Sequence, residues 1–171
     1  ITTADAKLYI PMGQLVDVAK EIARITKELE AANVTVTGAG DLLLSNSGDM
    51  VIKTLKLSGA AQKAIYNAGY AELYTVTVDG SQVRNKTDAT AQYLVDNNGG
   101  VLDLTDATIH DAWGTALHIR GSAAAAVTNV IIDGAGNYGT FVAGGSKLTG
   151  DGLVINNVAK NTEVSGAEGI G

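Results

Sequence analysis

The architecture follows from one stretch, Val127-Thr128-Asn129-Val130-Ile131-Ile132-Asp133, because similar runs recur along the 171-residue chain. The stretch is rich in β-branched residues, which favour strands. Comparable β-prone runs occupy 74–79, 104–109 and 153–157. A repeated run of this kind is typical of a solenoid, in which each repeat is one coil of the chain.

A shorter apolar segment opens each repeat and ends in a turn that is rich in small and polar residues. These segments begin at Ala64, Ala91, Ala116 and Phe141. The intervals between them are 27, 25 and 25 residues, and an earlier unit occupies 42–59. One such unit cannot bury its apolar side, whereas stacked units share a continuous core. The sequence therefore predicts a mainly β chain in which 41–171 form a right-handed parallel β-helix of about five coils.

Stacking of equivalent apolar side chains is the main stabilising interaction expected in this fold. Burying each of these side chains contributes roughly 1.5–3 kcal/mol to stability. The longer runs place the following residues inside: Val76, Val78, Leu104, Ile109, Val130, Ile132, Leu153 and Ile155. Outward threonine and lysine side chains keep the faces polar.

Asx residues fall just after the longer run, at Asp79, Asp111, Asp133 and Asn156. Asp and Asn tolerate left-handed backbone and bond to neighbouring amides, which suits a repeated corner. A stack of acids can also collect a hard cation such as Ca²⁺. One Asx residue per coil supplies few converging ligands, so we predict structural corners and no metal site.

Residues 1–40 form a separate N-terminal segment in this prediction. A short alternating stretch is stopped by Pro11, which cannot donate to a sheet ladder. The range 14–32 then carries apolar residues at alternating intervals of three and four, without glycine or proline. They are Leu15, Val18, Ile22, Ile25, Leu29 and Ala32. This spacing predicts an amphipathic α-helix.

Two uses of this apolar stripe compete. The helix can cover the first coil of its own chain, or it can pair with identical copies as a short coiled coil. At the other end, 166–171 are similar to the opening of another coil, with Ile170 as the apolar residue. An uncovered final coil would offer unpaired N–H and C=O groups, and head-to-tail docking of copies would build a filament. We therefore predict self-association through the stripe and Ile170.

The best candidate for a ligand-binding site is the cluster of His110, Asp111 and Trp113. Trp113 is the only tryptophan, and an indole beside a carboxylate can stack on a sugar ring. Further polar residues near the cluster are Asp106, His118 and Arg120. The alternative interpretation is a solvated turn in which Trp113 covers the edge of a coil. Because no second row of carboxylates stands out, we predict no catalytic residues and no cofactor.

Composition narrows the classes of function. The net charge of −6 and the pI near 4.7 argue against nucleic-acid binding, which needs clustered Lys and Arg. The absence of cysteine excludes disulfides, thiol catalysis and zinc–cysteine sites. The two histidines limit any His-rich metal site. Every apolar run is shorter than the roughly 18 residues that a membrane span needs.

From Val127 to Thr149 the sequence resembles autotransporter passenger domains of the pertactin type, and pectin-lyase-like solenoids in general. The likeness extends over 41–171 and implies a right-handed β-helix, a secreted or surface-exposed location and an adhesive role. Locally, 8–32 is similar to the start of the C-terminal arm of valyl-tRNA synthetases, where a strand-like segment leads into a charged helix. The basic residues of that arm do not follow here, so tRNA binding is not expected.

These observations predict a secreted or cell-surface structural β-helix that associates with itself and has an adhesive role, with surface glycans as candidate partners. Two other functions stay open. One is a polysaccharide-active or glycan-binding β-helix that uses the face around His110, Asp111 and Trp113. The other is a viral fibre in which the helix stripe trimerises ahead of a β-helical shaft.

Overall fold

The computed structural model describes residues 2–4, 21–25, 28–38, 40–60, 62–81, 92–165 and 169–170. These residues form a mainly β, parallel solenoid of about five turns, which confirms the predicted class of fold. Within this part of the chain, no helix is long and apolar enough to cross a membrane.

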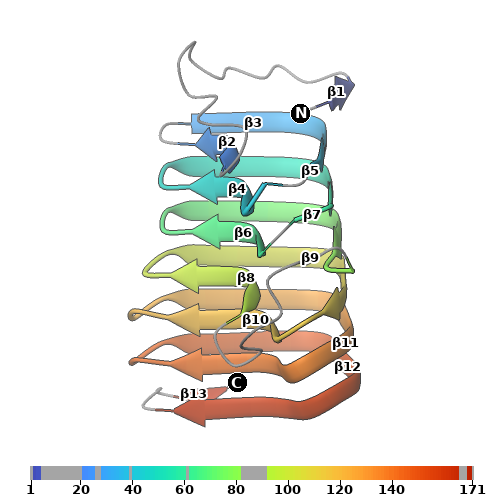
Figure 1. Ribbon diagram of the computed structural model, residues 1–171. Helices are drawn as coiled ribbons and strands as arrows, with labels where there is room; N and C mark the ends of the chain where they lie inside the picture. Colours follow the sequence, from blue (N-terminus) through green and yellow to red (C-terminus); the bar gives the residue numbers. More distant parts are fainter. Residues whose placement is uncertain are drawn as a thin grey trace.

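As far as β10, each coil contains one short and one long strand, whereas β11 and β12 each run through both sides of their coil (Figure 1). The short strands are β2 (Glu21–Ile25), β4 (Leu42–Asn46), β6 (Lys63–Asn67), β8 (Tyr93–Asn98) and β10 (Thr115–Arg120). The long strands are β3 (Glu28–Thr37), β5 (Asp49–Ser58), β7 (Tyr70–Asp79), β9 (Val101–Ala112), β11 (Ala124–Ala143) and β12 (Lys147–Ser165). Two brief strands are β1 (Thr2–Ala4) and β13 (Gly169–Ile170).

The strands of successive coils pair in two parallel ladders. The long-strand ladder runs from β3, at the top of Figure 1, through β5, β7, β9 and β11 to β12 at the bottom. The short-strand ladder runs from β2 to β10 and continues into the end of β11, where Leu117 is opposite Thr140. Among the described strands only β1 pairs in the antiparallel sense, with Thr2 opposite Thr35 of β3.

The repeat length differs from the predicted one. Asn46 and Asn67 occupy equivalent positions 21 residues apart. Asn67 and Asn97 are also equivalent, yet they are 30 residues apart, because the coil between them is longer. The predicted spacing of 27, 25 and 25 residues is therefore wrong at each step, because Leu117 follows its equivalent Val95 by 22 residues and Phe141 follows His118 by 23. It compared similar residue types, whereas the register follows the buried positions of the paired strands.

The core contains the predicted interior residues. Those at most 2% exposed are Val76, Val78, Leu104, Ile109, Val130 and Ile132, and those half-buried against the core are Leu153 and Ile155. Equivalent positions stack from coil to coil, as in the column of Ile52, Leu73, Leu104 and Val127. The prediction of stacked aliphatic interiors is confirmed, and columns of this kind together are the source of most of the hydrophobic stabilisation.

One corner of the coil bends at residues with left-handed backbone. Thr75, Asp106, Asn129 and Gly152 are in register there, with φ between 47° and 70°. Asn129 Nδ2 donates a hydrogen bond of 2.6 Å to Asp106 Oδ1 in the neighbouring coil. The preference of Asx residues for this backbone explains the bend in two of the coils.

At the next corner, the alignment of the Asx residues differs from the predicted one. Asp79, Asp133 and Asn156 share one column, but the residue of β9 in that column is His110. Asp111 lies one position later and has left-handed backbone, with φ of 57°. The prediction placed Asp111 in the column because it counted residues after the run, and that count is shifted by one in this coil.

Strands occupy the described part of the range in which the sequence predicted the N-terminal helix. In the range 14–32, the described residues belong to β2 and β3. Of the predicted stripe, Ile22 and Ile25 lie in β2, Leu29 and Ala32 lie in β3, and Leu15 and Val18 lie outside the described residues. The helix is thus not confirmed, and the coil stack includes residues before 41.

The apolar positions of β3 explain this difference. Leu29, Val34 and Val36 are at most 4% exposed. They lie opposite the buried Met50, Leu55 and Leu57 of β5, so the two strands share one pattern of buried positions. Parallel pairing with β5 satisfies the backbone of β3 and buries these side chains, which outweighs the helical propensity of the segment.

Candidate functional site

The candidate site lies at the corner where β7 and β9 end. His110 of β9 has Asp79 of β7 opposite it in the preceding coil and Asp133 of β11 opposite it in the following coil. The imidazole therefore lies in a column between two carboxylate-bearing positions. In a regular strand, neighbouring side chains point to opposite faces. The left-handed backbone of Asp111 interrupts that alternation and lets Asp111 reach the side chain of His110.

The side chains at this corner contact one another. His110 Nδ1 lies 2.8 Å from Asp111 Oδ2, to which it donates a hydrogen bond, and 3.9 Å from Asp79 Oδ1. Asp79 Oδ1 also accepts a hydrogen bond of 2.8 Å from the backbone N–H of Ser81. The side chain of Asp111 is 61% exposed, and those of Asp79 and His110 are about half as exposed. The cluster is held in place and is open to solvent.

The surroundings of Asp79 favour the ionised form of its carboxyl group. Burial raises its pKa, but the hydrogen bonds from Ser81 and the proximity of His110 outweigh burial and lower the pKa below its ordinary value. A general acid in glycoside cleavage needs a raised pKa instead. Asp79 is therefore suited to bind a cation or a hydroxyl group and unsuited to protonate a leaving group.

Two shallow hollows meet at Asp111. One has a volume of about 520 Å³ and is lined by Asp111, Trp113, Ser81 and Asn157, together with small residues. The other, also of about 520 Å³, lies beside His110, Asp111 and Asn157. Both hollows open to solvent, so they can accept part of a long ligand more readily than they can enclose a small one.

Glycines of the neighbouring coil leave room for the backbone of Trp113. A Cβ atom on Gly136 would come within 2.0 Å of the backbone carbonyl oxygen of Trp113, so no larger residue fits there without moving that backbone. Gly134 has left-handed backbone with φ of 91°. Both glycines line the first hollow, and the side chain of Trp113 beside it is 37% exposed. The absence of side chains on these glycines makes the hollow.

The structure brings the three predicted site residues, His110, Asp111 and Trp113, to the same corner. The other polar residues of the predicted cluster lie elsewhere, with Asp106 at the preceding corner and His118 and Arg120 on the short-strand ladder. Sequence reasoning did not assign Asp79 to the site. The signal was present, because Asp79-Gly80 and Asp133-Gly134 end successive long runs on either side of His110-Asp111.

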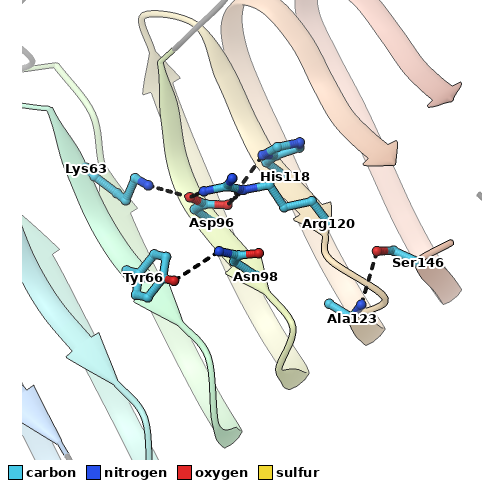
Figure 2. A network of polar contacts seen from close by, with 8 residues as sticks. All are labelled: Lys63, Tyr66, Asp96, Asn98, His118, Arg120, Ala123 and Ser146. Carbon is cyan, nitrogen blue, oxygen red and sulfur yellow. Dashed lines mark hydrogen bonds and ion pairs between the residues drawn. The ribbon is translucent and has the colours of Figure 1, made fainter. Parts of the chain in front are cut away.

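A second polar cluster surrounds Asp96 on the short-strand ladder (Figure 2). The side chain of Asp96 is fully buried and forms an ion pair with Lys63. Arg120 Nε and Nη2 donate to its two oxygens at 3.0 and 2.9 Å, and His118 Nδ1 lies 3.3 Å from Asp96 Oδ1. The four residues come from β6, β8 and β10, so the cluster links three coils.

The protonation of Asp96 indicates a structural role for this second cluster. Burial raises the pKa of Asp96, but the nearby imidazole of His118, the hydrogen bonds from Arg120 and the charge of Lys63 hold it well below its usual range. A carboxylate that is ionised and saturated with donors is a poor proton acceptor and has little capacity left for a ligand.

An aromatic stack runs beside the Asp96 cluster. Ring centroids are 3.9 Å apart for Tyr93 and His118, 5.1 Å for His118 and Phe141, and 5.2 Å for Phe141 and Tyr138. The two inner rings have their faces covered by their neighbours in the stack. Trp113, which borders a hollow, is better placed than these rings to stack on a ligand.

Comparisons with known proteins leave the function to be inferred from this geometry. No family model matches the chain. No curated protein and no solved structure matches it either.

Proposed function

We propose that this protein is a secreted or cell-surface adhesive β-solenoid that binds a carbohydrate chain at the corner formed by Asp111 and Trp113. The observation that carries this proposal is the open hollow lined by Trp113, Asp111 and Asn157, residues whose side chains carry an indole, a carboxylate and an amide. A right-handed coil of the kind found in autotransporter passengers would present this corner along the side of a rod. The stacked coils support that assignment of the architecture.

The chemistry of a sugar ring matches the lining of the hollow. The C–H groups of a pyranose form an apolar face that packs on an indole, while its hydroxyls need acceptors and donors at the rim. Asp111 supplies acceptors, and Asn157 and Ser81 supply both kinds of group. The openness of the hollow suits a chain that passes across the surface.

Replacing Trp113 with alanine is the direct test. The Trp113→Ala variant should bind a recognised polysaccharide about tenfold more weakly, equivalent to roughly 1.4 kcal/mol, because the stacking surface is removed. Trp113→Phe keeps an aromatic face and should retain most of the affinity. Screening wild type on an array of neutral and acidic polysaccharides, followed by calorimetry of the variants, measures both effects.

A matched control for this test is Val101→Ala, which shortens an exposed apolar side chain at the start of β9, whereas the hollow lies at the end of β9. It should bind like wild type. The proposal is wrong if wild type retains none of the arrayed polysaccharides, or if Trp113→Ala binds as tightly as wild type does.

Self-association is a second candidate function, and the edge of β12 supports it. In the described part of the chain, β12 pairs with β11 along most of its length but with β13 only at Lys147 and Leu148. Val154 on β12 is 47% exposed. A row of strand N–H and C=O groups beside exposed apolar side chains can accept a strand from a second copy.

Charge placed on this edge should reduce association. We expect the mean mass of the wild-type chain in sedimentation velocity to rise with concentration. The Val154→Lys variant should suppress that rise, because pairing at the edge of β12 would remove the charge of the lysine from water. A chain that stays monomeric over a hundredfold range of concentration would exclude this second function and leave carbohydrate binding untouched.

A further inference from the structure

Three side chains of the metal-binding type converge at the corner of β7 and β9. One ligand atom from each of Asp79, His110 and Asp111 lies within 4.8 Å of the other two. Two of them come from neighbouring coils in register, and the third reaches the group because Asp111 has left-handed backbone. A count of one Asx residue per coil predicts no metal here, because it leaves His110 out of the column.

The charges of this cluster are not balanced by cations among the described residues. The ion pairs of Lys63 and Arg120 go to Asp96, and none of the described pairs joins a lysine or arginine to Asp79 or Asp111. The second hollow adjoins His110 and Asp111 and leaves room for an ion with its water ligands. The corner therefore combines an excess of negative charge, an imidazole and an accessible space.

We infer that Asp79, His110 and Asp111 bind a divalent transition-metal ion, with Zn²⁺ as the best match. Mixed imidazole and carboxylate ligands favour zinc over the all-oxygen shells that calcium and magnesium prefer. Ligand atoms around a tetrahedral zinc are about 3.3 Å apart. The observed distances of 2.8 and 3.9 Å from His110 Nδ1 lie on either side of that value. Zinc would take the place of the proton that Nδ1 donates to Asp111, and the neutral imidazole would keep its proton on Nε2.

Three protein ligands leave one coordination position for water or for a ligand atom. Asp111 lines both hollows, so a water molecule or a ligand atom can approach this corner from either one. The inference stands without the carbohydrate proposal, because metal binding by the apo chain can be measured with no polysaccharide present. A failure of one therefore leaves the other unaffected.

The test uses the full chain after treatment with EDTA, titrated with ZnCl₂ in a calorimeter. We expect saturable binding of one Zn²⁺ per chain, weakened at least tenfold in His110→Ala and in Asp79→Asn. Asp79→Asn keeps the size of the side chain, so it reports on ligation if the alanine variant proves unstable. The matched control is Asp151→Asn, an exposed position on β12 that should bind zinc within twofold of wild type.

Histidine NMR gives a second readout, because the chain contains only two histidines. His118 is buried between Tyr93 and Phe141, so it serves as an internal reference. Zinc should shift the imidazole signals of His110 and leave those of His118 in place. Equal affinity in wild type and both site variants, no saturable binding by wild type, or a shift confined to His118 would each overturn the inference.

Discussion

The Asp96→Asn variant is expected to have a free energy of unfolding about 3 kcal/mol lower than that of wild type, although the two side chains have nearly the same shape. Asparagine removes the negative charge that faces Lys63 and Arg120. Losing one partner of a buried ion network costs about 3–5 kcal/mol, because the remaining charges stay desolvated. The lower value applies here, since the side chains of Lys63 and Arg120 are 22% and 39% exposed and water can partly solvate them.

Unfolding in guanidinium chloride at pH 7 measures this change, with Asp151→Asn as the matched control. Asp151 is exposed on β12, so its replacement should change the free energy of unfolding by less than about 0.5 kcal/mol. A loss at Asp96 no larger than that of the control would show that the network contributes nothing.

The effect at Asp96 should also depend on pH in a defined direction. Its pKa is lowered in the folded state, so its stabilisation is complete above the ordinary value of about 3.9 and is lost as the pH falls below it. The difference in unfolding free energy between wild type and Asp96→Asn should therefore shrink from pH 5 towards pH 2. An equal difference at pH 7 and pH 3 would contradict the ion-pair explanation.

The solenoid was predictable because each coil repeats the same alternation of buried and exposed residues. Val130 and Ile132 illustrate this, since both sit in β-branched runs and both stack on their equivalents in β9. The register was not predictable from residue types, because the coils differ in length. The interval from Asn46 to Asn67 is 21 residues, and that from Asn67 to Asn97 is 30 residues. Only backbone pairing shows which residues of unequal coils are equivalent.

The N-terminal strands show how one sequence pattern can fit two structures. The spacing of Ile25, Leu29 and Ala32 matches a helix, while that of Leu29, Val34 and Val36 matches the buried positions of a coil. A local segment is compatible with both. The choice depends on a neighbouring strand that can pair with it and bury its side chains, and this partner lies outside any local window.

The candidate site was predictable only to the extent that its residues are close in sequence. His110, Asp111 and Trp113 lie within four positions of one another, so their composition alone indicates a cluster. Asp79 joins them through the register of two coils whose separation the sequence does not reveal. The same reason hid the Asp96 cluster, whose members come from three separate strands.

A ladder of buried asparagines is the second place where a single substitution should have a large effect. Asn46 Nδ2 donates to Asn67 Oδ1 at 2.7 Å, and Asn67 Nδ2 donates to Asn97 Oδ1 at 2.8 Å. Asn67 Nδ2 also reaches the carbonyl oxygens of Gly69 and Val101, at 3.1 and 2.9 Å. Each amide therefore links its own turn to the next coil, and all three asparagines are fully buried.

Replacing Asn67 with alanine should lower the free energy of unfolding by about 4 kcal/mol, since each buried group left without a partner costs about 1–3 kcal/mol. Asn67→Asp distinguishes hydrogen bonding from packing, because aspartate keeps the volume but cannot donate to Asn97 Oδ1 when ionised. It should destabilise the protein at least as much as alanine does at pH 7. The matched control is Asn156→Ala, which truncates an asparagine at an exposed position and should be nearly neutral. If Asn67→Asp were as mild as that control, the ladder would hold no coils together, and the stability of the stack would have to come from its aliphatic columns alone.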